Sequence, residues 1–218
     1  MDSIVDIARN KMHQWTLPLT SYYLRRKLKT TDFSIIASNC IGTRIYRELG
    51  IEYTSPFIGL FICAPDYIVM LKDLARYLSL PLEFVEKSKY DGQGNFVVNY
   101  KYPIGQLGDK IEIHFLYNRN REEAKINWNR RLKRINWKNL FTTFTDRDFC
   151  TKELLCEFDS LPFQRKVCFT AKHIPAIGSS VWVKDYCDQS YVGDLYTNYR
   201  VLKKYFDFVA WLNLMQVS

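Results

Sequence analysis

Glycine and proline are scarce in this sequence, and neither gathers into a run. The 218 residues include 9 glycines and 7 prolines, and the chain has no Ser-rich stretch, no low-complexity tract and no internal repeat. Flexible linkers between domains are built from such stretches. Their absence favours one compact domain. We expect an N-terminal helical extension over residues 1–30 and a single α/β domain over residues 31–218.

Long apolar runs and closely paired cysteines are also missing. The longest apolar run, residues 56–65, is too short to span a bilayer, and residues 1–17 lack the continuous apolar segment of a signal peptide. The six cysteines contain no C-x-x-C pair, and several lie within apolar stretches. Such thiols are typical of reduced, buried positions. These absences predict a cytoplasmic protein.

Hydrophobic residues, aromatic residues and positive charge are plentiful. Hydrophobic residues make up 47% of the chain and aromatic residues 16%, and the net charge is +8. Positive charge favours phosphates, sugar nucleotides, nucleic acid or an anionic membrane surface as partners. Nucleic acid is the least favoured, because no RNA-binding signature, zinc-finger spacing or Gly/Arg tract is present. Residues 22–29, "YYLRRKLK", could lie peripherally on a membrane, although a packed helix with a solvated charged face is the simpler interpretation.

Short β-rich stretches alternate with amphipathic stretches of helical spacing. We predict strands at 33–39, 110–118, 139–146, 166–171 and 180–186, and helices at 2–16, 19–29, 43–50, 65–79, 121–135, 151–161 and 205–213. This alternation implies βαβ crossovers and a mostly parallel sheet that is flanked by helices, which makes a three-layer α/β domain. The turn "DGQGN" at 91–95 predicts an additional antiparallel hairpin near residues 82–102.

Ligands in open α/β sheets bind beyond the carboxyl ends of the strands. The polar residues expected there are Ser38, Asn39, Cys40, Gly42, Arg119, Asp146, Arg147, Asp148 and Lys172. The loop over 38–43 could offer backbone N–H groups to a phosphate, or it could be a tight turn that needs Gly42. His114 shares a strand face with Glu112, so it could serve as a general base. A hydrogen-bonded core histidine is the commoner outcome.

The predicted helix over 121–135 carries Arg130, Arg131 and Arg134. Guanidinium groups suit the recognition of a diphosphate. Arg131 lies at the edge of the apolar stripe, so the alternative is that it pairs with a protein carboxylate such as Asp146 or Asp148.

Asp146 and Asp148 flank Arg147 directly after a predicted strand. In glycosyltransferases of the GT-A type, two aspartates in this spacing hold Mn²⁺ or Mg²⁺ against a sugar diphosphate, and carboxylates are suitable ligands for these ions. Both aspartates are therefore candidate metal ligands and catalytic residues. The alternative is structural, because Asp is also favoured where a helix begins.

Eight stretches together resemble a known family. In order they are "FSIIASNCIG", "PFIGLF", "YPIGQL", "IEIHFL", "WNRRLKRI", "FTDRDFCT", "FDSLPFQRKVCFT" and "FDFVAWLN", which span about residues 32–213. The chain resembles an uncharacterised bacterial family, a domain of unknown function (DUF1919) often labelled as an exopolysaccharide biosynthesis protein. The resemblance implies an α/β fold and a setting in exopolysaccharide or capsule assembly. It implies no reaction and no catalytic residues.

Two hypotheses about function follow. The first is a glycosyl or related sugar transferase that acts on a nucleotide-activated or lipid-linked sugar. In it, Asp146 and Asp148 position the donor or a metal, the helix arginines hold the diphosphate, and His114 or Glu112 is the base. The second is a non-catalytic adaptor of a polysaccharide assembly complex, in contact with the inner membrane or with assembly proteins.

Overall fold

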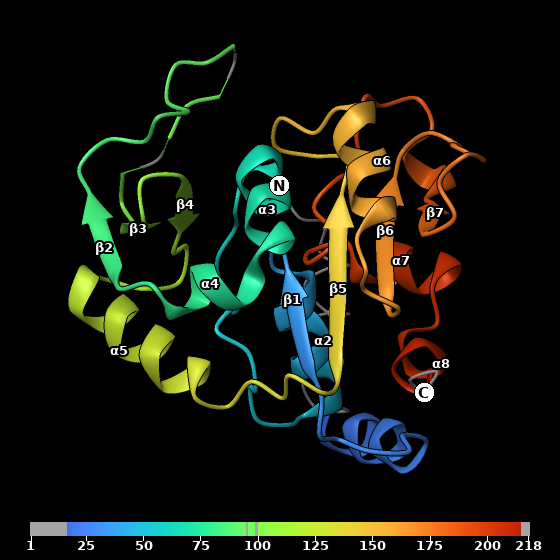
Figure 1. Ribbon diagram of the computed structural model, residues 1–218. Coiled ribbons are helices and arrows are strands. Elements are labelled where there is room, and N and C mark those ends of the chain that lie inside the picture. The colour runs from blue at the N-terminus through green and yellow to red at the C-terminus, as the bar shows by residue number, and fades with distance from the viewer. Residues whose placement is uncertain (1–16, 95, 99, 215–218) are drawn as a thin grey trace, which may run out of the picture.

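A four-stranded parallel sheet forms the centre of the computed structural model, which describes residues 17–94, 96–98 and 100–214. The strand order is β1-β5-β6-β7, and every neighbouring pair is parallel. Figure 1 shows β1, β5 and β6 running toward the same end of the molecule. The strands are β1 (Ser34–Ala37), β5 (Leu140–Thr145), β6 (Lys166–Thr170) and β7 (Ser180–Trp182). Four of the predicted strand positions are thereby confirmed.

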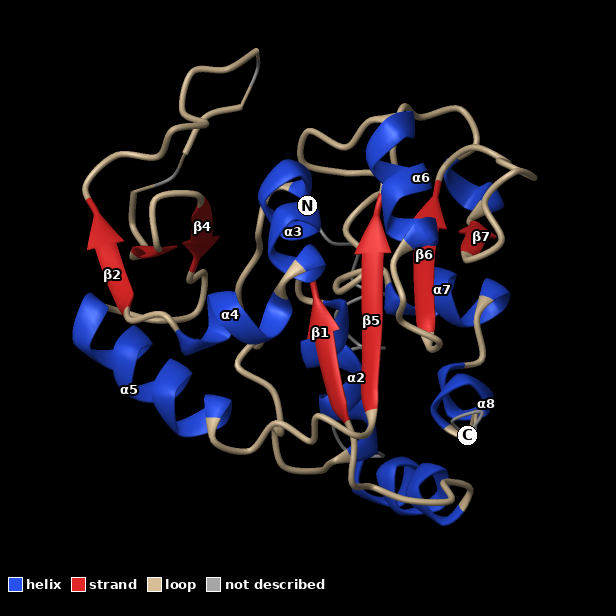
Figure 2. Ribbon diagram, in the orientation of Figure 1, coloured by secondary structure: helices blue, strands red, loops and turns tan. Residues whose placement is uncertain are grey.

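Helices cover both faces of this sheet (Figure 2). Alternate residues of β1 point to opposite sides: Ile36 packs in one core cluster, and Ile35 and Ala37 pack in another. The first cluster includes α3 (Ala64–Lys72) and α6 (Lys152–Ser160). The second includes α2 (Ile41–Leu49), α7 (Tyr199–Tyr205) and α8 (Phe208–Leu212). The predicted three-layer arrangement is confirmed.

A second, antiparallel sheet confirms the predicted antiparallel addition, although the pairing within it differs from the expected one. Its order is β2-β3-β4, formed by β2 (Leu82–Val85), β3 (Ile104–Leu107) and β4 (Ile111–His114). The partner of β2 is β3, so residues 86–103 form a long excursion instead of a tight hairpin. The strand predicted at 110–118 is β4, which belongs to this sheet and not to the parallel one.

Two buried carboxylates hold the excursion in place. Asp66 accepts hydrogen bonds from Lys89 Nζ (2.8 Å), the Tyr90 hydroxyl (2.7 Å) and the backbone N–H of Glu112 (2.8 Å). Glu112 accepts from the Ser88 hydroxyl (2.7 Å) and from the backbone N–H of Lys89 (2.8 Å). These long-range bonds outweigh the local hairpin preference of residues 91–95. Glu112 therefore organises the fold.

One short segment joins the two sheets. Phe61 exchanges two backbone hydrogen bonds with His114 (3.0 and 2.9 Å), and the next residue, Ile62, donates to the carbonyl of Ser38 just beyond β1 (2.8 Å). The backbone N–H of Ser38 in turn donates to Thr143 in β5 (3.4 Å). The carboxyl end of β4 is thus held beside the carboxyl ends of β1 and β5.

Several helix boundaries differ from the prediction. The helix expected at 65–79 is interrupted at Asp73, whose φ of −146° is not helical, and α4 (Leu74–Ser79) follows. The residues expected as one C-terminal helix at 205–213 contain the end of α7 and all of α8. The stretch after β7 turns into a 3₁₀ helix at Lys184–Tyr186.

Three helices begin at a residue whose side chain caps them. One is α8, where Asp207 accepts from the N–H groups of Val209 and Ala210 (both 3.0 Å). Asn120 caps α5 (Arg121–Leu132), and its side chain accepts from the Glu123 N–H (2.8 Å). Thr151 caps α6 and accepts from the Leu154 N–H (3.4 Å). The alternative that Asp146 or Asp148 caps the following helix is therefore wrong, because Thr151 caps α6.

The described residues 17–26 are helical, and this helix includes Pro18. The helix predicted at 2–16 lies outside the described residues. Within residues 17–94, 96–98 and 100–214, no helix is both long enough and apolar enough to cross a membrane.

Gly59 offers a test of how the inter-sheet segment is held. Its φ is +69°, and a Cβ would lie 2.7 Å from Cδ2 of Tyr117, whereas Gly92 (φ +76°) has nothing within 4 Å. Both alanine variants adopt a left-handed backbone that costs about 1–2 kcal/mol. We expect Gly59→Ala to lower the free energy of unfolding by roughly 1–3 kcal/mol more than Gly92→Ala, because it also displaces Tyr117. Urea unfolding measures both; equal losses would contradict the tight packing.

Candidate functional site

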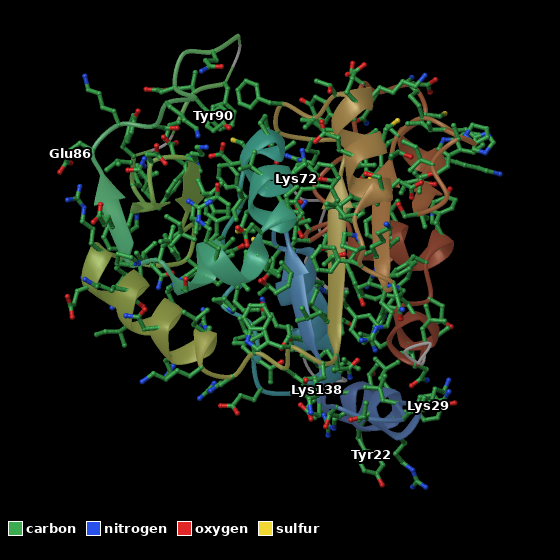
Figure 3. All side chains as sticks on the ribbon, in the orientation of Figure 1. Tyr22, Lys29, Lys72, Glu86, Tyr90 and Lys138 are labelled. Atoms are coloured by element: carbon green, nitrogen blue, oxygen red, sulfur yellow. The ribbon has the colours of Figure 1, made fainter. Side chains whose placement is uncertain are left out.

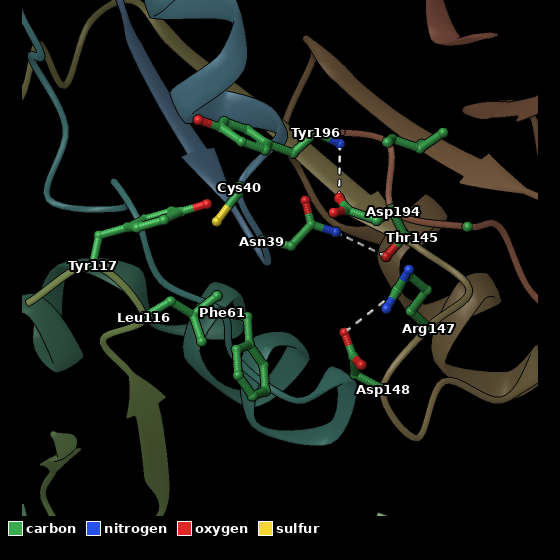
Figure 4. Close-up of a pocket in the computed structure, with 12 residues that line it drawn as sticks. Asn39, Cys40, Phe61, Leu116, Tyr117, Thr145, Arg147, Asp148, Asp194 and Tyr196 are labelled. Carbon is green, nitrogen blue, oxygen red and sulfur yellow. Dashed lines mark hydrogen bonds and ion pairs between the residues drawn. The ribbon is translucent and has the colours of Figure 1, made fainter. Parts of the chain in front are cut away.

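A cavity of about 310 Å³ opens at the carboxyl ends of β1 and β5. The chain leaves β1 for α2 on one face of the sheet and leaves β5 for α6 on the other face. Adjacent strands whose connections part in this way leave a crevice, and open α/β sheets bind ligands there. The residues that line it follow β1 and β5 or come from the segments at 116–117 and 193–196, with Phe61 from the inter-sheet segment (Figure 4).

Asn39 lines the cavity and connects the elements around it. Its Nδ2 donates to the hydroxyl of Thr145 (3.1 Å), and its Oδ1 accepts from the backbone N–H of Ile41 at the start of α2 (3.1 Å). One side chain thus ties the ends of two strands to the first turn of a helix. The amide fixes the geometry of the site through these bonds.

Asp146 points into the protein and not into the cavity. Its Oδ2 accepts from the backbone N–H of Ala171 (2.6 Å), and its Oδ1 accepts from the backbone N–H of Val192 (2.8 Å). The carboxylate therefore ties the end of β5 to the end of β6 and to the segment that leads to 193–196. Asp146 is a structural anchor for one wall of the site.

Asp148 lines the cavity with a carboxylate that no hydrogen-bond donor satisfies among the described residues. The nearest charge is Arg147, whose Nε lies 3.9 Å from Oδ2 (Figure 4). The side chain is 23% exposed. Burial raises the pKa of the Asp148 carboxyl, and the positive charge of Arg147 lowers it in part. A carboxyl with a raised pKa in a cleft is a candidate for proton transfer.

The backbone at this position is strained. Asp148 and Phe149 have φ values of 53° and 66°, a region that L-residues rarely adopt. The Phe149 ring packs against Tyr90 and Phe96 of the excursion, with centroids 5.0 and 5.1 Å apart, and the Asp148 carbonyl accepts from the Ala64 N–H (2.8 Å). Strain of this kind persists only where surrounding contacts impose it, and it gathers at functional sites.

Arg147 is the one basic residue among the described residues that line the cavity. Its Nη1 donates to the carbonyl of Val192 (3.4 Å), and its guanidinium lies 5.8 Å from the Tyr191 ring centroid. Asp194 also lines the cavity, but its oxygens accept from Tyr196 N (2.9 Å) and the Thr197 hydroxyl (2.6 Å), which shape the turn.

The opposite wall is aromatic and apolar. Phe61, Leu116 and Tyr117 form it, and Tyr196 lies 6.2 Å from the Tyr117 ring. Burial raises the pKa of Tyr117 to about 12. Burial, together with the charge of Asp194, also raises the pKa of the Cys40 thiol to about 12. Cys40 is therefore protonated at neutral pH and is not an activated nucleophile.

Arg130 and Arg131 of α5, and Arg134 just beyond its end, lie outside the cavity. Arg130 donates to Asn127 (2.8 Å), Arg131 lies 5.2 Å from the Tyr53 ring, and Arg134 pairs with Glu52 (2.7 Å). Arg131 thus pairs neither with Asp146 nor with Asp148. The reason is topological, because α5 follows β4 in the small sheet.

Four other predicted residues are likewise not brought to the cavity. Gly42 packs its backbone on β1, where a Cβ would lie 3.2 Å from Cβ of Ala37. Ser38 is buried and uses its backbone in the inter-sheet bonds. Lys172 donates to the Cys187 carbonyl (2.6 Å), and Arg119 lines a separate hollow beside the excursion.

His114 is buried behind the aromatic wall. Its ring stacks on Phe61 with centroids 4.3 Å apart, and neither ring nitrogen has a hydrogen-bond partner among the described residues. Glu112 Oε2 lies 3.9 Å away. Burial lowers the pKa of His114 to about 4, so the ring is neutral at pH 7. It does not line the cavity.

The family model described as "Domain of unknown function (DUF1919)" matches residues 12–213. The chain belongs to the DUF1919 family. An "Uncharacterized protein" of Haemophilus influenzae is 36% identical over 210 residues, which cover 94% of this chain and 95% of the relative. Every residue that lines the cavity lies within the family match, which begins well before the stretches that first carried the resemblance.

The two aspartates of this DUF1919 domain do not share a ligand position. The carboxylate oxygens of Asp146 accept hydrogen bonds from backbone N–H groups, whereas Asp148 lines the cavity. Within the described part of the chain, no group of three or more His, Cys, Asp or Glu side chains is arranged to hold a metal ion. Of the predicted metal pair, Asp148 alone faces the space where a ligand would lie.

The division of roles predicts opposite stability effects. Asp146→Asn leaves one of two buried N–H groups facing an amide N–H, so we expect the free energy of unfolding to fall by about 1–3 kcal/mol. Asp148→Asn removes a charge that no donor satisfies, so stability stays the same or rises. Urea unfolding at pH 7 of the two single variants decides; a larger loss in Asp148→Asn would reverse the assignment.

The raised pKa of Asp148 also predicts a pH dependence. Because the folded state holds this proton more tightly than the unfolded chain, stability falls as the pH rises above the ordinary value of 3.8 and through the folded pKa. We expect Asp148→Asn to show a shallower fall than the wild type over this range. Parallel slopes in urea unfolding across that range would show that the carboxyl titrates normally.

Proposed function

We propose that this DUF1919 protein binds a phosphorylated or nucleotide-activated sugar in the cavity and acts on it as a glycosyl or related sugar transferase. The observation that carries the proposal is Asp148, a carboxyl of raised pKa that faces a cavity at the crevice between β1 and β5. Transfer to a hydroxyl group needs a base that removes its proton, and a carboxyl whose pKa is moved toward neutrality does this well.

The two walls of the cavity suit the two parts of such a ligand. Arg147 offers positive charge for a phosphate, and a guanidinium can donate two parallel hydrogen bonds to it. Phe61, Leu116 and Tyr117 offer an apolar surface on which the C–H face of a sugar ring can pack. The volume of about 310 Å³ is near the lower end of small-molecule sites, about 300–1,000 Å³. It suits one sugar with a phosphate, while a nucleotide would extend from the mouth.

The proposal allows for a divalent metal, with one protein carboxylate as its ligand instead of two. If Mn²⁺ or Mg²⁺ arrives with a diphosphate, Asp148 is the carboxylate that could complete its coordination, because Asp146 is committed to backbone N–H groups. Arg147 would then share the phosphate charge with the ion.

The polysaccharide setting rests on the resemblance and not on the site. The stretches "WNRR" and "FTDRDFCT" support placing the reaction in exopolysaccharide or capsule biosynthesis. A cytoplasmic location, proposed from the thiols, is consistent with a nucleotide-activated donor.

Ligand binding tests the proposal first. Thermal-shift measurements with UDP-, GDP-, CMP- and dTDP-sugars, each with and without Mn²⁺, should show a raised melting temperature for one donor, because a ligand that binds only the folded state stabilises it. The shift should vanish in Arg147→Gln, which removes the guanidinium proposed to bind the phosphate, and persist in Glu153→Gln, an exposed carboxylate on α6. No shift with any donor or sugar phosphate would favour the adaptor hypothesis.

Transfer tests the role of Asp148 itself. With the donor that binds, Asp148→Asn should lower the rate of sugar transfer by about 100-fold or more, the range expected for a lost general base. Glu153→Gln, the exposed control on α6, should retain the activity of the wild type. Equal activity in Asp148→Asn and the wild type would show that the carboxyl does not act as the base, whether or not the donor binds in the cavity.

A further inference from the structure

The helix over residues 17–26 is fastened to the domain by one face. The Ser21 hydroxyl donates to the carbonyl of Glu48 (2.7 Å), and Arg25 donates to the carbonyl of Leu49 (2.6 Å). Leu24 and Leu28 pack against the core cluster of α2. Spacings of three and four place Ser21, Leu24 and Arg25 on one side of the helix, and Leu28 follows its end. Both polar anchors lie at the end of α2, on the amino side of the parallel sheet.

The opposite face of the helix is aromatic, basic and open to solvent. Leu19, Tyr22 and Tyr23 are 77%, 55% and 60% exposed. Arg26 lies 5.9 Å from the Tyr22 ring, and Lys27 Nζ lies 4.3 Å from the Tyr23 ring. Figure 3 shows Tyr22 pointing away from the body of the protein. Residues 17–29 contain four basic residues and no acidic one.

The neighbouring loop before β5 extends this surface. Asn136 and Asn139 donate to the carbonyl of Asp32 (3.2 and 2.6 Å), which brings Trp137 and Lys138 to the same end of the molecule. Trp137 is 48% exposed. Lys29 and Lys138 both lie at this end in Figure 3.

We propose that this surface docks on a membrane that contains anionic lipid. Tyrosine and tryptophan place an apolar ring and a polar tip at a membrane–water interface. Lysine and arginine near an anionic leaflet each contribute about 1 kcal/mol. The cations here lie against the exposed rings, so both reach the headgroup layer together. A short helix of this kind lies in the interface and does not cross it.

Docking in this way orients the cavity. The helix lies at the amino end of the sheet and the cavity lies at the carboxyl end, so the six residues of β5 separate them by roughly 20 Å. The mouth of the cavity therefore faces the aqueous phase. This consequence rests on the proposed function: the sugar donor is a water-soluble nucleotide-activated sugar, not one whose lipid anchor remains in the bilayer.

Vesicle co-sedimentation of the full chain tests the docking. Vesicles of phosphatidylcholine are compared with vesicles that contain phosphatidylglycerol. We expect binding only to the second kind, weakened by salt as exposed charges are screened. The double variants Arg26→Glu/Lys29→Glu and Tyr22→Ser/Tyr23→Ser should each lower the affinity by about tenfold or more. The matched control Lys125→Glu/Lys152→Glu makes the same charge change on α5 and α6, at two exposed positions, and should bind as the wild type does.

The outcomes separate the alternatives. Binding that falls equally in the control would show attraction by net charge alone and overturn the proposal. A doubled mass in solution that Tyr22→Ser/Tyr23→Ser abolishes, with no vesicle binding, would assign the surface to a second copy of the chain. The donor-induced thermal shift should be unchanged in Arg26→Glu/Lys29→Glu, so a failure of docking and a failure of the proposed function are distinguishable.

Discussion

The backbone hydrogen bonds of Phe61 and Ile62 are the contacts on which the site depends. They connect the antiparallel sheet to the end of β1, so that the carboxyl end of β4 lies beside the carboxyl end of β1. Together with the bond from the Gly59 N–H to the Thr43 hydroxyl (2.9 Å), they hold the segment that carries Leu116 and Tyr117 beside Asn39 and Asp148. Phe61 also contributes its own ring to the cavity and separates it from the neutral ring of His114. The aromatic wall is thus a product of the join between the sheets.

Two aspartates one residue apart perform different tasks because the backbone turns sharply between them. Asp146 ends β5 with its oxygens on two backbone N–H groups, which fixes the segment that includes Asp194 and Tyr196. Asp148 follows in a left-handed conformation, which directs its carboxylate to the cavity. The spacing D-x-D suggested a shared ligand pair. In this fold the first carboxylate builds the site and the second one faces it.

Local patterns predicted the parallel sheet well because apolar strands and capped helices depend on nearby residues. They also placed Asn39, Cys40, Arg147 and Asp148 at the correct edge, since the edge follows from strand direction. The pairing of β2 with β3 depends on Asp66 and Glu112, whose partners are more than twenty residues away, and no local pattern reveals it. Leu116, Tyr117 and residues 193–196 were missed for the same reason: they reach the cavity through the inter-sheet join and the anchor at Asp146 and carry no motif.

The aromatic contacts of Phe149 make the excursion a mechanical support for the neighbouring carboxylate. The rings of Tyr90 and Phe96 pack against Phe149, the residue after Asp148, and the Tyr90 hydroxyl donates a hydrogen bond to Asp66. Residues that do not line the cavity therefore contribute to the direction in which Asp148 points. Family members that differ in the length or sequence of this excursion can therefore present this carboxylate differently while every residue of the cavity stays the same.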